Sequence, residues 1–289
     1  MAAPLSACLI VRDEAVEIAA CITAIAPYVD EVVVADTGST DGTAQLARRA
    51  GARVVEVPWS DDFAAARNAA TAACEHDWIL SLDADERPEG DPTALRELLT
   101  EITAQAVGVA FRIEGPNPRG AMPHRALRLF RRSAAQWQGR VHEEVVAREG
   151  ARLEVAQLPE RALTLVHTGY VDPAAFARKV ERNLALARAE VAELTAQDEP
   201  ADRRIAALLD LGRTELAAGL RADGAATLSR VRDLAGPGAA AWVWATDFLA
   251  WDGLRHGQVD EVWDLVAELV EQGAGEQHVR PLTERLLAD

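Results

Sequence analysis

The sequence predicts an α/β fold over residues 1–172 and an all-helical region over residues 173–289. Two observations lead to this division. Between residues 5 and 82, apolar runs of strand length alternate with segments whose apolar side chains recur at helical spacing. Those runs are apolar on both faces, which is typical of a parallel sheet covered by helices on both sides.

The first predicted strand is the continuous apolar run Leu5–Val11. A helix is expected over residues 14–26, because apolar residues recur there at helical spacing. The apolar residues at that spacing are Val16, Ala19, Ile22 and Ile25. The alternation continues with a strand over Glu31–Ala35, a helix over Thr43–Ala50 that stops at Gly51, a strand over Arg53–Val57, a helix over Phe63–Cys74 and a strand over Trp78–Leu82.

Residues 91–170 show a mixed, loop-rich pattern that still belongs to the first domain. A helix is expected over Pro92–Ile102, followed by short strands over Val107–Ile113, Ala126–Phe130, Glu144–Ala147 and Leu163–His167. Segments 114–123 and 133–142 are expected to form an acceptor-side loop that orders when substrate binds. Trp137 and Gln138 are candidates to line the acceptor pocket, and a plain core position is the alternative for Trp137.

From Pro173 onward the pattern is helical and contains one internal echo. Gly219-Leu220-Arg221 recurs 34 residues later as Gly253-Leu254-Arg255, and 34 residues is the period of tetratricopeptide (TPR) helix pairs. A chance three-residue match is the alternative. The helical tail is also a candidate for pairing two chains into a homodimer.

Composition excludes several classes of protein. The formal net charge of −16 repels nucleic acid and anionic lipid in general. No apolar run approaches the ~20 residues of a membrane span, and the N-terminal residues lack the pattern of a signal peptide. The cysteines Cys8, Cys21 and Cys74 form no CxxC pair, which disfavours a disulfide framework or a zinc site and favours a cytoplasmic protein.

The stretch ILSLDADE ends an apolar run in a cluster of carboxylates. Asp83 and Asp85 are expected at the carboxyl end of a strand, where open α/β sheets bind ligands. Two carboxylates this close are costly to ionise together without a cation. Mg²⁺ or Mn²⁺ would relieve that cost and complete its shell with water and substrate phosphates. The alternative is a solvated acidic turn.

Asp36 ends the second predicted strand and begins the segment DTGSTDGT. Its small residues allow close approach of a ligand to the backbone, and Asp36 could accept hydrogen bonds from a base or a ribose. The alternative is a plain turn in which Asp41 caps the next helix, which we favour for Asp41 itself. Neither a GxGxxG dinucleotide fingerprint nor a P-loop is present.

Later in the chain, five further side chains are candidates. Arg67, one turn into a predicted helix, could reach a phosphate or a base edge; the alternative is a surface arginine paired with an aspartate. His142 and His167 could join carboxylates around a metal ion, although a lone histidine is more often a structural residue. Glu143 or Glu144 could serve as a general base.

Taken together, CLIVRDEA, EVVVADTGSTDGT, WSDDFAAARN and WILSLDADE resemble family 2 glycosyltransferases in order and spacing. The similarity is greatest to a bacterial subgroup with TPR-like C-terminal helices, near the peptide S-glycosyltransferases. It continues through GRVHEE and HTGY to about residue 186. The resemblance implies a GT-A fold, a Rossmann-like mixed sheet that binds nucleotide-diphospho-sugars, followed by an all-α, TPR-like region.

The resemblance also implies roles for individual residues. Asp36 would bind the nucleotide base, usually uracil, with Val11 and Arg12 flanking it. A second group would bind the donor and its metal ion: Arg67 at the base or diphosphate, Asp83 and Ala84 at the ribose or the metal's water shell, and Asp85 at the metal itself. Glu143 would be the catalytic base and His167 a third metal contact, with His142 as the rival. Where relatives usually carry Lys-Asn-Glu, this chain has Arg12-Asp13-Glu14.

The activity implied is transfer of a sugar from a nucleotide diphosphate donor, expected to be a UDP-sugar, with Mn²⁺ or Mg²⁺ as cofactor. The acceptor would be a hydroxyl or thiol on a small molecule, peptide or glycan, and transfer would invert the anomeric centre. The alternative is a non-catalytic GT-A-like scaffold whose helical tail docks a peptide or protein partner.

Overall fold

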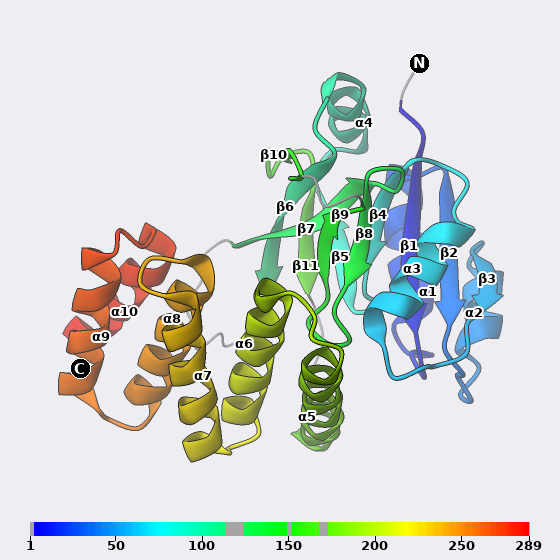
Figure 1. Cartoon of the computed structure of the whole chain (residues 1–289). Helices are drawn as coiled ribbons and strands as arrows, with labels where there is room; N and C mark the ends of the chain where they lie inside the picture. Colours follow the sequence, from blue (N-terminus) through cyan, green and yellow to red (C-terminus); the bar gives the residue numbers. More distant parts are fainter. Residues whose placement is uncertain (1–2, 114–123, 149–151, 168–172, 289) are drawn as a thin grey trace. The chain divides into compact units, whose positions relative to one another are not determined.

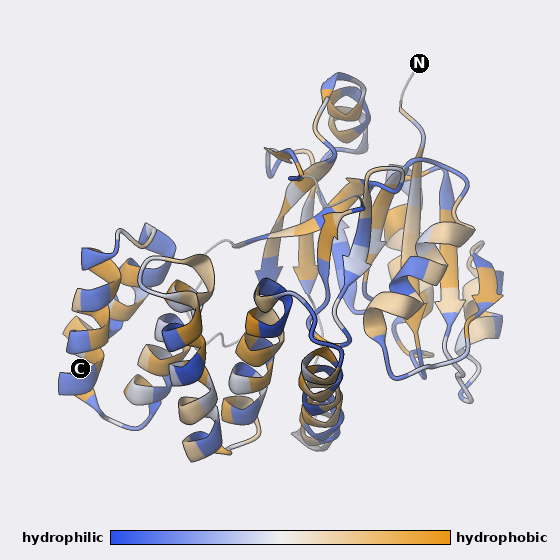
Figure 2. Ribbon diagram, in the orientation of Figure 1, coloured by the Kyte–Doolittle hydropathy of each residue, from blue (hydrophilic) through white to orange (hydrophobic). Residues whose placement is uncertain are grey.

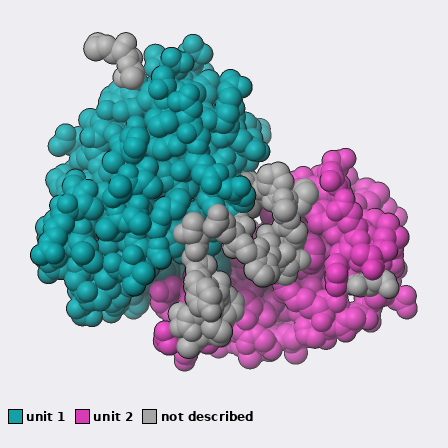
Figure 3. Space-filling view, turned by 180° about the vertical axis from the view of Figure 1, so that it is seen from behind, with its two compact units in different colours: residues 1–170 teal, residues 171–289 magenta. Residues whose placement is uncertain are grey.

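The structure is a computed structural model that describes residues 3–113, 124–148, 152–167 and 173–288. It divides into two compact units, Met1–Tyr170 and Val171–Asp289, which Figure 3 shows in different colours. Each unit is described by itself below. The assignment of a catalytic domain to residues 1–172 and of a helical domain to residues 173–289 stays a prediction.

The first unit is built on a mixed sheet with the strand order β3-β2-β1-β4-β7-β6-β11-β5 and with β10 beside β6 (Figure 1). Its strands are β1 Leu5–Val11, β2 Glu31–Asp36, β3 Arg53–Glu56, β4 Trp78–Leu82, β5 Glu86–Glu89, β6 Ala106–Ile113, β7 His124–Arg131, β10 Val155–Gln157 and β11 Thr164–His167. Strands β1 to β4 are mutually parallel, whereas β7 is antiparallel to both β4 and β6. A separate hairpin joins β8 Ala135–Gln138 to β9 Glu144–Ala147.

Helices cover both faces of the sheet, because successive side chains of a strand point to opposite sides. On β1, Leu5, Leu9 and Val11 join one core, whereas Cys8 joins the other. The first core packs against α1 Ile18–Ile25, α2 Thr43–Arg49 and α4 Pro92–Glu101, and the second packs against α3 Phe63–Ala73 and the β8–β9 hairpin. Figure 2 shows the hydrophobic colours concentrated along the strands.

The connection from β4 to β5 shows that the sheet curls. Residues 83–85 alone join them, so the Cα atoms of Leu82 and Glu86 lie at most about 15 Å apart. In a flat sheet, β4 and β5 would be four strand spacings apart, or about 19 Å. The part of the sheet from β4 to β5 therefore bends back, and the turn 83–85 crosses its concave end.

Because β1, β2 and β4 are parallel, their carboxyl ends meet at one edge of the sheet. Val11 is the register partner of Asp36 on β2. The Asp83–Asp85 turn leaves β4 at the same edge. The ends of β1, β2 and β4, which are far apart along the chain, thus lie at one edge of the sheet. This is the arrangement that the predicted parallel strands imply.

Most predicted elements occur where they were expected, and two differences have clear physical causes. Helix α1 begins at Ile18 rather than near residue 14, because the amides of Glu14 and Ala15 bond to side chains of the neighbouring loop. Val16 therefore lies outside the helix and is 89% exposed, so the predicted start of this helix is wrong. Strands β5, β8 and β10 were not predicted, because they are only three or four residues long and contain no continuous apolar run of strand length.

The second unit consists of helices that pack on their neighbours in chain order. They are α5 Pro173–Ala196, α6 Ala201–Ala217, α7 Arg221–Ala235, α8 Ala240–Arg255, α9 Val259–Glu271 and α10 Glu276–Ala288. Successive helices contact one another from α5 to α10, and α6 also contacts α8. The helix pairs α6–α7 and α8–α9 are thus TPR-like hairpins.

The 34-residue echo does not mark the structural repeat. Gly219 ends α6 with φ 76°, and the residue that ends α8 in the same way is Gly257, with φ 72°. The following residues, Leu220 and Gln258, share the same backbone conformation. Equivalent turns are therefore 38 residues apart, whereas Gly253 lies inside α8. The echo aligns positions that differ by about one helical turn.

Candidate active site

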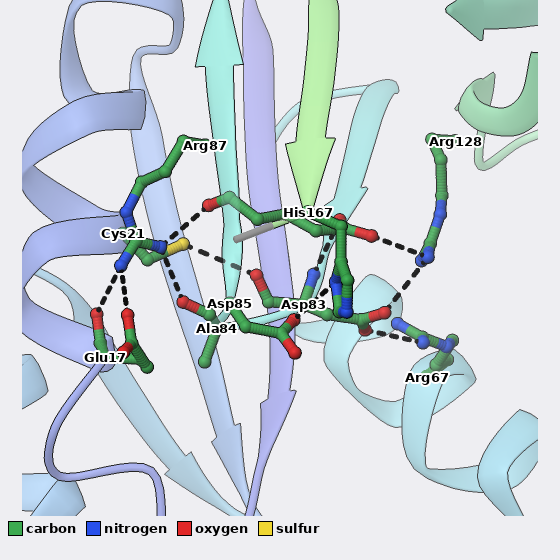
Figure 4. Close-up of polar contacts among 10 residues, drawn as sticks. Glu17, Cys21, Arg67, Asp83, Ala84, Asp85, Arg87, Arg128 and His167 are labelled. Carbon is green, nitrogen blue, oxygen red and sulfur yellow. Dashed lines mark hydrogen bonds and ion pairs between the residues drawn. The ribbon is translucent and has the colours of Figure 1, made fainter. Parts of the chain in front are cut away.

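Both carboxylate oxygens of Asp83 are bound by arginines. Oδ1 accepts a hydrogen bond from Arg67 Nη2 at 2.8 Å, and Oδ2 accepts one from Arg128 Nη2 at 3.0 Å. Burial alone would raise the pKa of Asp83, but the charges of Arg67 and Arg128 outweigh it and hold the pKa below its ordinary value. Asp83 is therefore an ionised carboxylate fixed between two guanidinium groups (Figure 4).

The backbone of the turn is fixed from the other side. The carbonyl of Ala84 accepts a hydrogen bond from Arg87 Nη1 at 2.7 Å, and that of Asp83 accepts one from the Cys21 thiol at 3.6 Å. The amide of Asp83 donates to Glu86 Oε2 at 2.9 Å. Ala84 itself is buried. Figure 4 shows that these contacts reach the turn from α1, from α3 and from neighbouring strands.

Asp85 pairs with His167, and the distance from Oδ1 to Nδ1 is 3.3 Å. The pairing follows from the topology, because β5 and β11 are antiparallel and Glu86 is the register partner of His167. Both side chains are about one-third exposed. The hydrogen bond to Asp85 raises the pKa of His167 against the opposing effect of burial.

Arg67 is only 6% exposed, and its donors are directed at protein atoms. Besides Asp83, it bonds to Glu143 Oε1 at 2.5 Å and to Ser81 Oγ at 3.1 Å, and its guanidinium lies 5.0 Å from the centre of the Trp137 ring. A surface arginine paired along its own helix is thus not what the structure shows. The resemblance implied that Arg67 contacts a base or diphosphate, and this stays a prediction. In the structure, Arg67 is buried and bonds to the side chains of Asp83, Glu143 and Ser81.

The β8–β9 hairpin is attached to α3 next to Arg67. Asn68 bonds to the backbone of Trp137 twice, at 2.9 Å in each case, and Phe63 N donates to Arg140 O at 2.9 Å. Trp137 is 5% exposed and packs against Phe130, so it is a core residue. This attachment brings Glu143 onto Arg67.

The other candidates from this hairpin and its flanking loop are placed less centrally. Glu144 and Gln138 are exposed. His142 lies in the loop before β9 with φ 57°. Of the two segments expected to form the acceptor-side loop, the structure describes 133–142. Segment 114–123 lies outside the described residues.

Asp36 closes the loop that follows β2. Its Oδ1 accepts hydrogen bonds from the amides of Gly38 and Ser39, at 3.0 and 2.7 Å. Thr37 bonds to the carbonyl of Val11 through both its amide and its hydroxyl. The side chains of Asp36 and Val11 are buried. The loop is thus shaped around the carboxylate that the resemblance assigns to the base.

A second set of hydrogen bonds joins this loop to the one that follows β1. Asp13 Oδ1 accepts from the amide of Thr40 at 2.7 Å, and Asp41 Oδ2 accepts from the amide of Ala15 at 2.9 Å. Asp41 Oδ1 also accepts from the amide of Thr43, at 3.0 Å, but the N-cap residue of α2 is Gly42, so the predicted capping position is one residue off. Arg12 stands exposed at the start of this joined pair of loops.

Three charged residues at the site were not predicted as site residues: Glu14, Glu86 and Arg128. Burial, and then the charges of Asp85 and Asp83, raise the pKa of Glu14 to about 7. Burial and the charge of Asp83 also raise the pKa of Glu86 to about 7. The signal for Arg128 was an arginine inside the otherwise apolar strand ALRLF, because a buried guanidinium requires a partner.

The side chains present fit a divalent cation at one place. Within the described residues, no group of three or more His, Cys, Asp or Glu side chains is arranged to hold a metal ion. Asp85 and His167 are nevertheless adjacent. A carboxylate oxygen suits Mn²⁺ or Mg²⁺, and a neutral imidazole nitrogen is a common metal ligand, so substrate phosphates and water could complete the shell. Asp83 differs, because both its oxygens bond to arginines.

Comparison with known proteins identifies the family. The sequence profile described as glycosyl transferase family 2 matches residues 6–153, just over half of the chain. This chain belongs to glycosyl transferase family 2. The predicted fold is confirmed: the curled mixed sheet followed by helices is the GT-A fold with a helical C-terminal region.

Curated relatives and solved structures share only parts of this family 2 chain. A TPR repeat-containing protein of Synechococcus elongatus is 43% identical over 146 residues, which is 50% of this chain and 36% of that protein. The lipopolysaccharide core biosynthesis glycosyltransferase LpsC of Rhizobium meliloti is 35% identical over 159 residues, 50% of this chain and 57% of LpsC. Glucosyl-3-phosphoglycerate synthase from Mycobacterium tuberculosis, solved with Mg²⁺ and uridine-diphosphate, is 30% identical over 38% of this chain and 44% of its own, with a TM-score of 0.33.

The chain covers less than two thirds of each of these relatives. In the part of the family 2 chain that the structure describes, none of the helices has both the length and the apolar character of a membrane span.

Proposed function

We propose that this family 2 chain transfers a sugar from a nucleotide diphosphate donor to a hydroxyl or thiol acceptor. The observation that carries the proposal is the pairing of Asp85 with His167 at the edge of the sheet where Asp36 also lies. A carboxylate for the base and a pair of metal-binding groups for the diphosphate are the parts that a nucleotide sugar requires. Family membership supports the same conclusion.

Asp85 and His167 are the residues we assign to the metal ion. A bound Mn²⁺ or Mg²⁺ would supply Lewis-acid stabilisation to the leaving diphosphate. Asp83 was expected to share this role. We assign it instead to holding the turn, because Arg67 and Arg128 bind both its oxygens.

The nucleotide would lie along the joined loops after β1 and β2. Asp36 presents a buried carboxylate whose Oδ1 is fixed by two backbone amides, so the group is held in one orientation. Val11 and Arg12 flank it at the end of β1. A UDP-sugar is the donor we expect, since a carboxylate can accept a hydrogen bond from the N–H group of uracil.

Glu143 is the residue we assign as the general base. Because its Oε1 is bonded to Arg67, the proton of the acceptor would go to Oε2. The sugar would pass through an oxocarbenium-like state, with the acceptor attacking from the face opposite the diphosphate. This arrangement inverts the anomeric centre. The acceptor is a glycan, a peptide or a small molecule, and LpsC, the relative named for lipopolysaccharide core synthesis, favours a glycan.

The test is donor hydrolysis. The protein is incubated with a set of UDP-sugars and Mn²⁺, and the release of UDP is measured. Wild type is expected to release UDP from at least one donor, and Asp85→Ala is expected to abolish the release. Asp198→Ala, an exposed aspartate of the helical unit, is the matched control and should behave as wild type.

Two results would count against the proposal. Equal UDP release by Asp85→Ala and wild type would remove the metal assignment. Absence of release with every donor, together with binding of a peptide or protein partner, would favour the non-catalytic scaffold instead.

A further inference from the structure

We infer that Arg128 is a positioning residue that fixes the metal-binding turn without touching the metal ion or the donor. The inference rests on the proposed function, because it concerns how that site is held. Arg128 lies on β7, and its side chain is 16% exposed. Figure 4 shows it reaching the turn from the side opposite Arg87.

The register of the sheet explains how Arg128 reaches the turn. Strand β7 is antiparallel to β4, and the pair Leu80–Leu129 is the last one toward the carboxyl end of β4. Arg128 is the next residue along β7, so it arrives where β4 ends and the turn begins. It is fixed by the strand and does not depend on a loop for its position.

Arg128 binds two carboxylates with one nitrogen. Its Nη2 lies 3.0 Å from Asp83 Oδ2 and 2.9 Å from Glu86 Oε1. Glu86 is 1% exposed and accepts the amide hydrogen of Asp83 through its other oxygen, Oε2. Arg128 therefore holds both ends of the segment that contains Asp85.

The same contact reaches the second metal-binding group. Glu86 is the first residue of β5 and pairs in register with His167 on β11. A shift of Glu86 would move β5 against β11 and change the distance between Asp85 and His167, which is 3.3 Å here. Arg128 thus sets the relative position of two side chains that it does not contact.

Electrostatics shows why no apolar residue could replace it. Asp83 and Glu86 are adjacent carboxylates, and Glu86 is nearly fully buried. Without Arg128, the Glu86 side chain would lose its ion pair, and Asp83 would keep only its ion pair with Arg67. Like charges at this distance repel strongly in a buried site, so the turn would open.

The experiment measures metal binding separately from nucleoside binding and from activity. Mn²⁺ affinity is measured by electron paramagnetic resonance in the presence of UDP, and uridine affinity by calorimetry, for wild type, Arg128→Met and Arg128→Lys. Residues that support metal ligands from outside the coordination shell typically change metal affinity about 10–100-fold. Arg128→Met is expected to weaken Mn²⁺ binding by at least about tenfold on that basis, with uridine affinity unchanged.

Arg128→Lys keeps the charge but presents a single ammonium group, so we expect it to bind Mn²⁺ with intermediate affinity. Arg131→Met is the matched control, because Arg131 lies on the same strand and pairs with Asp77 away from the turn. It is expected to keep the wild-type affinity for Mn²⁺.

If Arg128→Met does not fold, the double variant Arg128→Met/Glu86→Gln is used in the same assays. It also removes the carboxylate that Arg128→Met leaves unpaired. Weak Mn²⁺ binding by the double variant supports positioning. Wild-type Mn²⁺ affinity in Arg128→Met or in the double variant overturns the inference. A loss of uridine affinity as large as the loss of Mn²⁺ affinity also overturns it. Failure of wild type itself to bind Mn²⁺ with UDP would instead refute the proposed function.

Discussion

Glu143 Oε1 lies 2.5 Å from Nε of Arg67, which places a carboxylate from the β8–β9 hairpin directly on a buried guanidinium of α3. The contact orients Glu143 and leaves Oε2 as the atom that can accept a proton. Arg67 in turn holds Asp83, so one arginine links the proposed base to the turn that we assign to the metal ion.

The first prediction concerns the base. Glu143→Gln keeps the shape of the side chain but removes its basicity, so we expect turnover to fall by about 10²–10⁴-fold while donor affinity stays unchanged. Glu144→Gln, which changes an exposed neighbour, is the control and should retain turnover. The reverse result, loss of turnover only in Glu144→Gln, would assign the base to Glu144.

The second prediction separates Asp83 from Asp85. Asp83→Asn weakens two charged hydrogen bonds and is expected to lower the free energy of unfolding by about 2–3 kcal/mol. Asp85→Asn is expected to change stability little and to remove Mn²⁺ binding in the presence of UDP. Urea titration and metal titration of both variants check this. Equal stability of the two variants would show that the arginine contacts of Asp83 contribute nothing.

The third prediction concerns the buried guanidinium of Arg67. In wild type, Arg67 forms ion pairs with both Glu143 and Asp83, and Arg67→Met removes both pairs. Breaking a buried ion pair costs about 3–5 kcal/mol, so we expect the free energy of unfolding to fall by about that amount. Arg67→Met/Glu143→Gln removes one of the unpaired charges, so it should recover part of the loss in urea unfolding. A double variant no more stable than Arg67→Met would contradict the electrostatic explanation.

The fourth prediction is a pH dependence at the start of the sheet. Hydrogen bonds from Arg96 lower the pKa of Asp30 below its ordinary value of 3.8, with a further contribution from the amide of Leu5. A lowered carboxyl pKa stabilises the fold above the unfolded value, and this contribution is lost as the pH falls through the lower folded value.

Asp30→Asn should therefore be less stable than wild type near neutral pH, by about 0.2–1 kcal/mol for such an exposed pair. The difference should shrink below pH 3.8. Urea unfolding at a series of pH values measures it. A difference that does not change down to pH ~2.5 would mean that Asp30 has the same pKa in both states.

The fifth prediction uses the helical unit. A Cβ atom on Gly253 would lie 2.7 Å from Cγ2 of Val262, so Gly253→Ala should destabilise the protein by about 1–3 kcal/mol through overpacking. In a Val262→Ala background the space is open, and alanine should then stabilise α8 by up to about 1 kcal/mol. Thermal unfolding of wild type, the two single variants and the double variant checks this change of sign. The same sign in both backgrounds would rule out the steric cause.

The sequence predicted the fold well where apolar patterns are long. The strands Leu5–Val11 and Trp78–Leu82 have the predicted bounds, because every residue in them faces a core on one side or the other. Strand β5, with the sequence ERPE, has no apolar pattern. It exists because β11 pairs with it, which no local signal reveals.

For the candidate site, the sequence indicated which residues gather but not how they pair. Asp36 and Asp85 follow strand ends, and the parallel topology brings those ends together. The pairing of Asp83 with Arg128 depends on the register between β4 and β7, and these strands are far apart in the chain. Positions of this kind are set by tertiary structure, so only the unusual arginine within an apolar strand hinted at them.

The short link between β4 and β5 has a consequence for how the first unit opens. Residues 83–85 join an inner strand to the outermost one, so β5 cannot separate from β11 without pulling on the end of β4. An edge strand would ordinarily fray first and exchange its amide hydrogens quickly. Here β5 should exchange more slowly than an ordinary edge strand, so Asp85, the carboxylate that we assign to the metal ion, is anchored through β4 to the interior of the sheet.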